Sequence, residues 1–105
     1  MRYKGRPGSQ VVTVGHRLDA GTSARVRPHL HRAVDAGHGD LVVDLAGLET
    51  IDATGLGVLV GTHRRAGAAG RRLVLRHVPP RIMRVLAVTR LNRVLVVEPS
   101  EAAVA

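Results

Sequence analysis

Residues 41–61 read LVVDLAGLETIDATGLGVLVG, and this stretch indicates the fold class of the chain. Its first five residues are almost continuously apolar, which is typical of a strand buried on both faces in a parallel sheet covered by helices. A polar connection follows, and after it we expect a helix over residues 55–69 that ends at Gly70. The inward stripe of this helix, read at helical spacing, would consist of Leu56, Leu59, Val60 and His63.

The segments on either side continue the alternation of strand and helix. Short apolar or β-branched runs at residues 10–14, 73–78 and 93–97 predict strands. The order strand, helix, strand, helix, strand, helix, strand predicts an α/β domain with right-handed crossovers. We therefore expect a four- to five-stranded, mostly parallel or mixed sheet flanked by helices, with residues 41–46 beside 73–78. A fifth strand would come from an edge fragment at residues 1–4.

Two further helices are expected from their start and stop signals. Thr22 or Ser23 can cap a helix that runs to about Ala36, and Pro80 suits the first turn of the other. Pro28 lies several residues inside the first of these helices, so we expect a kink or a later start there. The inner faces would be Val26, Leu30, Ala33 and Val34 in the first helix and Ile82, Val85, Leu86 and Thr89 in the other.

The length of 105 residues is that of one domain. We expect a single domain over residues 1–105, with its core at about 10–98 and loose tails at 1–9 and 99–105. The residues expected to be mostly buried are Leu41, Val43, Leu45, Leu56, Leu59, Val60, Leu73, Leu75 and Leu86.

Composition excludes several classes of protein. The chain has no cysteine, so a disulfide scaffold and thiolate metal sites are excluded, and a cytoplasmic protein is expected. The longest stretch without a charge or histidine, residues 53–62, is half of the roughly 20 residues that a membrane-spanning helix needs. We therefore expect no membrane insertion. The first ten residues lack the apolar run of a secretory signal.

The net charge of +8 invites a nucleic-acid interpretation, but the distribution of charge weakens it. Fifteen of the 16 basic residues are arginine, in a chain also rich in alanine, glycine and valine, so the positive charge follows from a general bias of composition. The single aromatic residue, Tyr3, offers no platform on which the bases of a single strand could stack. Residues 41–61 hold three acids and no base, whereas residues 63–97 hold nine arginines and no acid. This pattern suits a protein-docking surface, and we expect no specific binding to nucleic acid.

Catalytic and cofactor motifs are not apparent in the sequence. The glycines at 55, 57 and 61 miss the spacing of the dinucleotide fingerprint, and no Gly-Lys-Ser/Thr occurs. We interpret Gly57 and Gly61 as positions of close packing between helix and sheet. His29 and His31 are two residues apart, which points them to different helical faces. Asp44, on its strand, is expected to pair structurally. We therefore predict a binding module that is not an enzyme and has no cofactor or metal.

The same residues carry a resemblance to a family. Residues 41–75 resemble the STAS domain, the fold of bacterial anti-sigma factor antagonists, and the match extends back to VVTVGHRLDAGT and forward through VPPRIMRVLAVTRLNRVLVV. Its most specific part is the block Asp-Ala-Thr-Gly-Leu-Gly at 52–57. The sequence departs from the family pattern at His16 and Arg17, where Gly-Glu is usual before Leu-Asp, and its N-terminus is shorter by roughly one strand of five to six residues.

The resemblance implies a phosphorylation site and a mechanism of partner switching. The hydroxyl residue that matches the family's phosphorylation site is Thr54. The unmodified antagonist would bind an anti-sigma factor that is also a histidine-kinase-like serine/threonine kinase, and so release a sigma factor for transcription. Phosphorylation would end that complex, and a phosphatase would reset it. The partner-binding residues would be Asp19, Asp52, Ala53, Thr54, Gly55, Leu56 and Gly57.

Alternatives remain open at this point. From its position alone, Thr54 could equally be an ordinary helix N-cap. The same fold could serve as a regulatory or docking subunit of a membrane-transport system. A third reading, binding of nucleic acid by the basic surface, predicts retention on DNA that falls steeply with salt. A weak homodimer is also left open.

Overall fold

The structure of the protein is a computed structural model that describes residues 9–99. Its main sheet has four parallel strands in the order β1-β3-β5-β6. These strands are β1 (Gln10–Thr13), β3 (Leu41–Asp44), β5 (Leu73–Arg76) and β6 (Val96–Val97). The expected edge strand at residues 1–4 lies outside the described residues.

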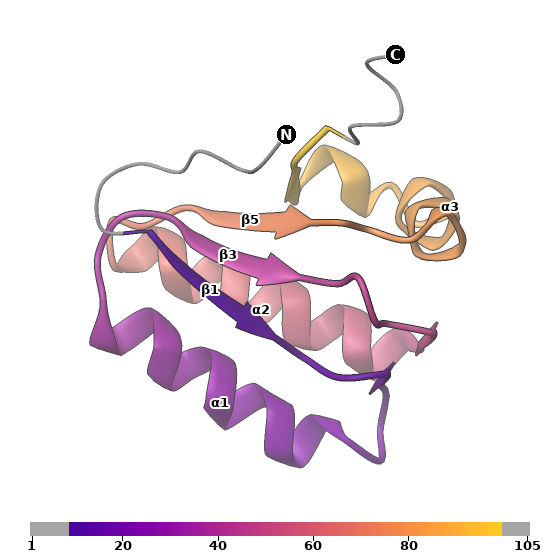
Figure 1. The fold of residues 1–105 in the computed structure, drawn as a ribbon, viewed down its shortest axis with the longest axis horizontal. Helices are drawn as coiled ribbons and strands as arrows, with labels where there is room; N and C mark the ends of the chain where they lie inside the picture. Colours follow the sequence, from indigo (N-terminus) through magenta and orange to yellow (C-terminus); the bar gives the residue numbers. More distant parts are fainter. Residues whose placement is uncertain (1–8, 100–105) are drawn as a thin grey trace.

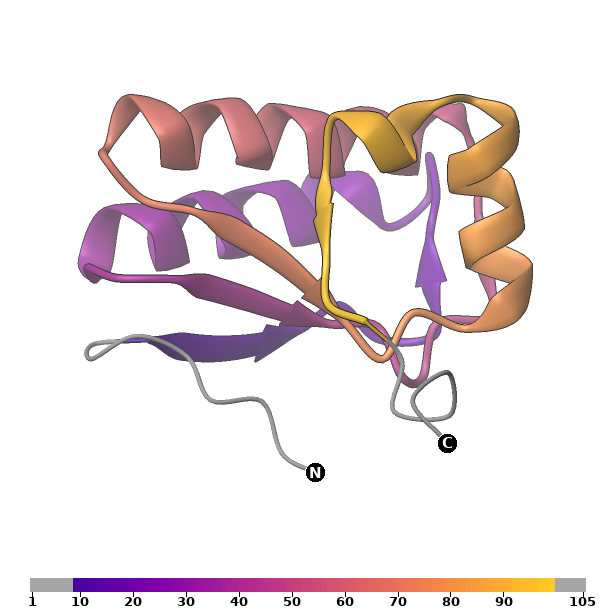
Figure 2. The same cartoon turned by 90° about the horizontal axis from the view of Figure 1, so that it is seen from above.

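A second, two-stranded parallel sheet pairs β2 (Arg17–Leu18) with β4 (Thr50–Ile51). The helices are α1 (Ser23–Ala36), α2 (Ala53–Ala68) and α3 (Pro80–Val88), and a short 3₁₀ turn, Leu91–Arg93, precedes β6. Helices α1 and α2 lie side by side on one face of the main sheet, and α3 lies beyond the carboxyl ends of its strands (Figures 1 and 2). The predicted fold class is confirmed.

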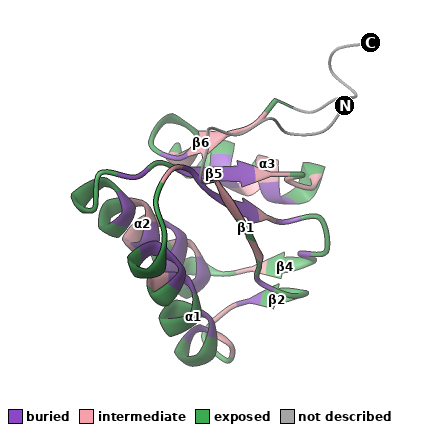
Figure 3. Cartoon of the chain, turned by 60° about the vertical axis from the view of Figure 1, so that its left-hand side comes forward, coloured by how far each residue is buried: buried purple, intermediate pink, exposed green. Residues whose placement is uncertain are grey.

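The centre of the main sheet is as buried as its apolar sequence predicted. In the register of the sheet, Val42 of β3 lies between Val11 of β1 and Val74 of β5, so residues 41–46 and 73–78 are adjacent as expected. The three apolar residues of β3 and of β5 are almost fully buried, on both faces of the sheet. Figure 3 shows the buried residues gathered on the sheet and on the helix faces turned toward it.

The inner stripe of α2 differs from the prediction. Of the expected residues, Leu59 is buried, whereas Leu56, Val60 and His63 are only half-buried. The buried face of α2 is rotated from the predicted one and includes a polar residue, Thr62. Thr62 can be buried because its hydroxyl donates to the carbonyl of Val58, at 2.7 Å, within the same helix. The buried positions of α2 are Gly55, Val58, Leu59, Thr62 and Ala66.

The boundaries of the other helices also correct the predictions. Helix α1 begins at Ser23 and continues through Pro28, so the predicted later start of this helix is wrong. Pro28 lies on the exposed side of the helix, where water can solvate the carbonyl that proline leaves without a donor. In α3, Ile82 and Leu86 are buried as expected. Val85 is half-buried and Thr89, which follows the last helical residue, is exposed.

A buried arginine fixes the end of α1, and hydrophobic periodicity did not predict it. Arg71 is 7% exposed. Its guanidinium donates to the carbonyls of Ala33 and Val34, both at 2.8 Å, to the carbonyl of Gly39 at 2.9 Å, and to the side chain of Gln10 at 3.1 Å. These bonds satisfy carbonyls that the last turn of a helix leaves without donors, and they join α1 to the start of β1.

Candidate functional site

Two loops whose joined residues, Ala20 and Asp52, are 32 positions apart in the sequence meet at the first turn of α2. The parallel pairing of β2 with β4 sets Arg17 opposite Thr50 and Leu18 opposite Ile51. Asp52 follows β4 and caps α2. One oxygen of its carboxylate accepts the N–H of Gly55 at 2.8 Å, and the other accepts the N–H of Ala20 at 3.0 Å. A single carboxylate therefore holds the start of the helix and the loop beside it.

The approach of these loops depends on Gly55. A Cβ on this residue would collide with the carbonyl oxygen of Leu18 and would lie 2.7 Å from its carbonyl carbon. Gly57 and Gly61, which we interpreted as the close-packing positions, have nothing within 4 Å of such a Cβ, so that interpretation is wrong. The close-packing glycine of α2 is therefore Gly55, which faces the backbone of β2.

Asp19 organises the loop between β2 and α1. Its carboxylate accepts the N–H groups of Gly21 at 2.9 Å and Thr22 at 3.1 Å, and the guanidinium of Arg17 lies 2.9 Å from it. The hydrogen bond from Arg17 holds the pKa of the Asp19 carboxyl below its usual value. Thr22 flanks α1 without capping it, because its hydroxyl accepts the N–H of Asp19 and donates to the carbonyl of Arg17.

Thr54 is exposed in the first turn of α2. Because Asp52 supplies the cap, the N-cap interpretation of Thr54 is wrong. Its hydroxyl makes no hydrogen bond to any residue within 9–99. Of the other residues predicted for the partner surface, Asp52, Ala53 and Gly57 are exposed, Asp19 and Leu56 are half-buried, and Gly55 is buried.

The electrostatic surroundings of Thr54 are mixed. Asp52 and Glu49, which precede it in the chain, are exposed, and the side chain of Arg17, 64% exposed, is held by Asp19. The third acid of this stretch, Asp44, is engaged elsewhere: it lies 3.0 Å from Arg76 and accepts the N–H of Ala46. Its structural pairing was predicted correctly.

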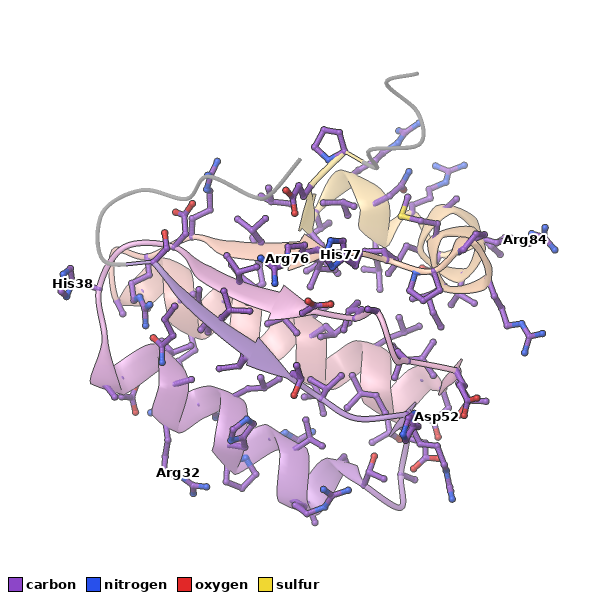
Figure 4. The ribbon with its side chains drawn as sticks, viewed as in Figure 1. Arg32, His38, Asp52, Arg76, His77 and Arg84 are labelled. Atoms are coloured by element: carbon purple, nitrogen blue, oxygen red, sulfur yellow. The ribbon has the colours of Figure 1, made fainter. Side chains whose placement is uncertain are left out.

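The pKa of Asp44 reflects this pairing. Burial by itself raises the pKa of the Asp44 carboxyl, but hydrogen bonds from the Ala46 N–H, Arg76 and His77 outweigh burial and hold it below its usual value. Asp44 is therefore a structural anion at pH 7, bound to Arg76 and His77, which are labelled side by side in Figure 4.

Metal ligation finds no support at this site. Within residues 9–99 no group of three or more histidine, cysteine, aspartate or glutamate side chains is arranged to hold a metal ion. In the same part of the chain no helix is both long and apolar enough to cross a bilayer.

The sequence analysis missed the two short strands that bring the site together. Strands β2 and β4 have two residues each, too few for a period to be visible. Arg17 belongs to β2 and holds Asp19, and Gly55 lies against the backbone of the same strand. The signal that could have indicated the cap was Asp52 itself, an aspartate directly before a helical run.

The double role of Asp52 can be separated by substitution. Asp52→Ala should lower the free energy of unfolding by about 1–2 kcal/mol, because it removes the cap and the bond to Ala20. Asp52→Asn keeps one acceptor oxygen for the N–H of Gly55 but offers an NH₂ group to Ala20, so its cost should be smaller, about 0.5–1 kcal/mol. Urea denaturation of both variants measures this. No loss of stability in Asp52→Asn would show that the bond to Ala20 contributes nothing, and equal losses in the two variants would show that the cap bond to Gly55 contributes nothing.

Comparisons with known proteins agree with this architecture. A family model described as "Mlab, STAS domain" matches residues 1–98. A search of curated proteins gave no match. Among solved structures, an anti-sigma factor antagonist from Mycobacterium paratuberculosis is 24% identical with a TM-score of 0.73, over 95% of this chain and 85% of that one.

Two further structures have the same fold. The Bacillus cell fate determinant SpoIIAA in its phosphorylated form is 19% identical with a TM-score of 0.65, over 94% of this chain and 90% of that one. The murine anion transporter Slc26a9 is 18% identical with a TM-score of 0.68, over 82% of this chain and 14% of that one. The family match, which extends over almost the whole chain, and the shared fold place this protein in the STAS domain family.

Proposed function

We propose that the protein is an anti-sigma factor antagonist whose binding is switched off by phosphorylation of Thr54. In its unmodified form it would bind an anti-sigma factor that is also a histidine-kinase-like serine/threonine kinase, in the cytoplasm, and release a sigma factor. A phosphatase would restore the unmodified form. The protein itself would act by binding and would not be an enzyme.

One observation carries this proposal: the hydroxyl of Thr54 is exposed and makes no hydrogen bond within the described chain, because Asp52 caps α2. A kinase could therefore phosphorylate this hydroxyl without first breaking the cap of α2. SpoIIAA, which has the same fold, has been solved in a phosphorylated form and is described as an anti-sigma factor antagonist. Both facts support assigning the same chemistry to Thr54 here.

The local electrostatics fit a switch that spares the fold. A phosphate adds a charge of about −1.5 to −2, and the first N–H groups of a helix, which have no acceptors within it, favour an anion there. Asp52 and Glu49 already make the loop acidic, and Arg17 is held by Asp19. The added charge should thus act mainly on whatever is docked over Thr54.

The test is phosphorylation by a candidate kinase, such as a histidine-kinase-like ATPase encoded beside this protein. Incubation with ATP should add one phosphate, which mass spectrometry should place on Thr54, and Thr54→Ala should abolish it. Thr50→Ala is the matched control: this threonine is also exposed and lies on β4, just before the helix, and its loss should leave phosphorylation unchanged. Phosphate on another residue would contradict the assignment of Thr54.

A second candidate function is a regulatory or docking subunit of a membrane-transport system. The observation that favours it is the similarity to the STAS portion of the anion transporter Slc26a9. In that case the protein should co-purify with a transporter component, equally well as wild type and as Thr54→Ala, and no kinase should modify it.

A further inference from the structure

A groove outside the Thr54 region runs between the end of β1 and helix α1. Its volume is about 400 Å³, within the range of small-molecule sites. The lining residues are Thr13, Val14, Gly15, Arg25, Val26, His29 and Arg32. Figure 4 shows Arg32 on α1 well away from Asp52 at the start of α2, so the far end of the groove lies apart from the surface around Thr54.

The groove is basic along one side. Arg25, His29 and Arg32 follow one another at i, i+4 and i+7, which sets them in a stripe along α1. No acidic side chain is among the residues that line it. Within residues 9–99, these three side chains take part in no hydrogen bond or ion pair, and the nearest acid on the helix, Asp35, is bound by Arg65 of α2 instead.

This stripe is unfavourable for the fold by itself. Arg25 lies in the first turn of α1, where the helix dipole disfavours a cation. No described contact of this side chain offsets that effect. An anion in the groove would offset it, since it would bring negative charge to the stripe and to the start of the helix.

The opposite wall offers polar groups and open space. Thr13 is exposed and carries a hydroxyl, and Gly15 has a φ of 87°, where a side chain would be strained. Nothing lies within 4 Å of the position that a Cβ on Gly15 would take, so this end of the groove is open. Val14 and Val26 are buried beneath it and give the groove a firm floor.

We propose that this groove binds a small anion that carries at least two phosphate groups. Arginine forks pair with phosphate oxygens in a bidentate manner, which suits Arg25 and Arg32 to this class of ligand. Their backbones are about 10 Å apart along the helix, from a rise of about 1.5 Å per residue. A single phosphate therefore engages only part of the stripe, whereas a di- or polyphosphate extends along it. This proposal does not depend on the role of Thr54.

Calorimetric titration with inorganic phosphate, pyrophosphate and tripolyphosphate, at 0.15 M salt, tests this. Affinity should rise from phosphate to tripolyphosphate, and the double variant Arg25→Ala, Arg32→Ala should lose at least tenfold for tripolyphosphate. The matched control, Arg81→Ala with Arg84→Ala, removes the same charge from two exposed positions of α3 and should change affinity less than twofold. Figure 4 labels Arg84 on that helix. All four arginines are exposed, so neither double variant should unfold at a lower temperature than the wild type.

The amide signals of residues 13–15 should shift on titration in NMR spectra of the wild type. Equal losses in the two double variants would show that net charge alone attracts the anion, and would overturn the proposal. So would tripolyphosphate binding no more tightly than inorganic phosphate, or no binding of the wild type at millimolar concentration.

Discussion

Gly55→Ala should lower the free energy of unfolding by about 3 kcal/mol, at the upper end of what overpacking costs. The added methyl group would meet the backbone carbonyl of Leu18, which is part of β2 and cannot rotate away as a side chain could. Either α2 must move away from the small β2–β4 sheet or the sheet must shift. In a domain of this size each kcal/mol corresponds to about 4–8 °C, so thermal unfolding measures the effect readily.

Gly57→Ala is the control for this substitution. Gly57 lies in the same helix, is exposed, and has open space where a Cβ would be placed. Alanine there should raise the free energy of unfolding by about 0.5–1 kcal/mol, through the higher helix propensity of alanine. The two variants have the same composition and should nevertheless differ by roughly 4 kcal/mol. If both were stabilised, the close approach of Gly55 to Leu18 would be contradicted.

The contrast between these two glycines shows how far the sequence could predict the site. The motif at 52–57 indicated the candidate loop, and the structure places Thr54 exposed in the first turn of its helix. The sequence could not distinguish Gly55 from Gly57, because the difference lies in a backbone segment more than 30 residues earlier. That segment, β2, has two residues and no visible periodicity.

The fold was more predictable than the site because burial on both faces leaves a strong signal. The apolar runs of β3 and β5 identified the centre of the sheet directly. Errors arose where polar residues are buried. Thr62 belongs to the buried face of α2, because its hydroxyl donates to a carbonyl of the same helix. Arg71 is buried at the end of α1, where its guanidinium donates to several carbonyls. Hydrophobic periodicity treats both as surface residues, because their hydrogen bonds exist only in the folded chain.

Thr54→Glu should separate the stability of the protein from its binding. Glutamate in the first turn of α2 is favoured by the helix dipole, so the free energy of unfolding should be unchanged or higher by about 0.3–1 kcal/mol. Under the proposed function the same charge would enter the centre of the docked surface. We expect affinity for the anti-sigma factor to fall about 30-fold, equivalent to about 2 kcal/mol. Fluorescence anisotropy or calorimetry with the purified partner measures it.

Two further variants identify the cause of that loss. Thr54→Gln has nearly the size of the glutamate without its charge, so it should weaken binding less if repulsion dominates. Thr89→Glu adds the same charge at an exposed position beyond the end of α3 and should leave affinity within twofold of the wild type. An equal loss with Thr89→Glu would indicate a general effect of net charge. If Thr54→Glu bound as tightly as the wild type, the surface around Thr54 would not be the docked one. If the wild type bound no anti-sigma factor at all, the transporter-linked function would be favoured. Because Thr54→Glu should lower affinity without lowering stability, damage to the fold cannot imitate the expected result.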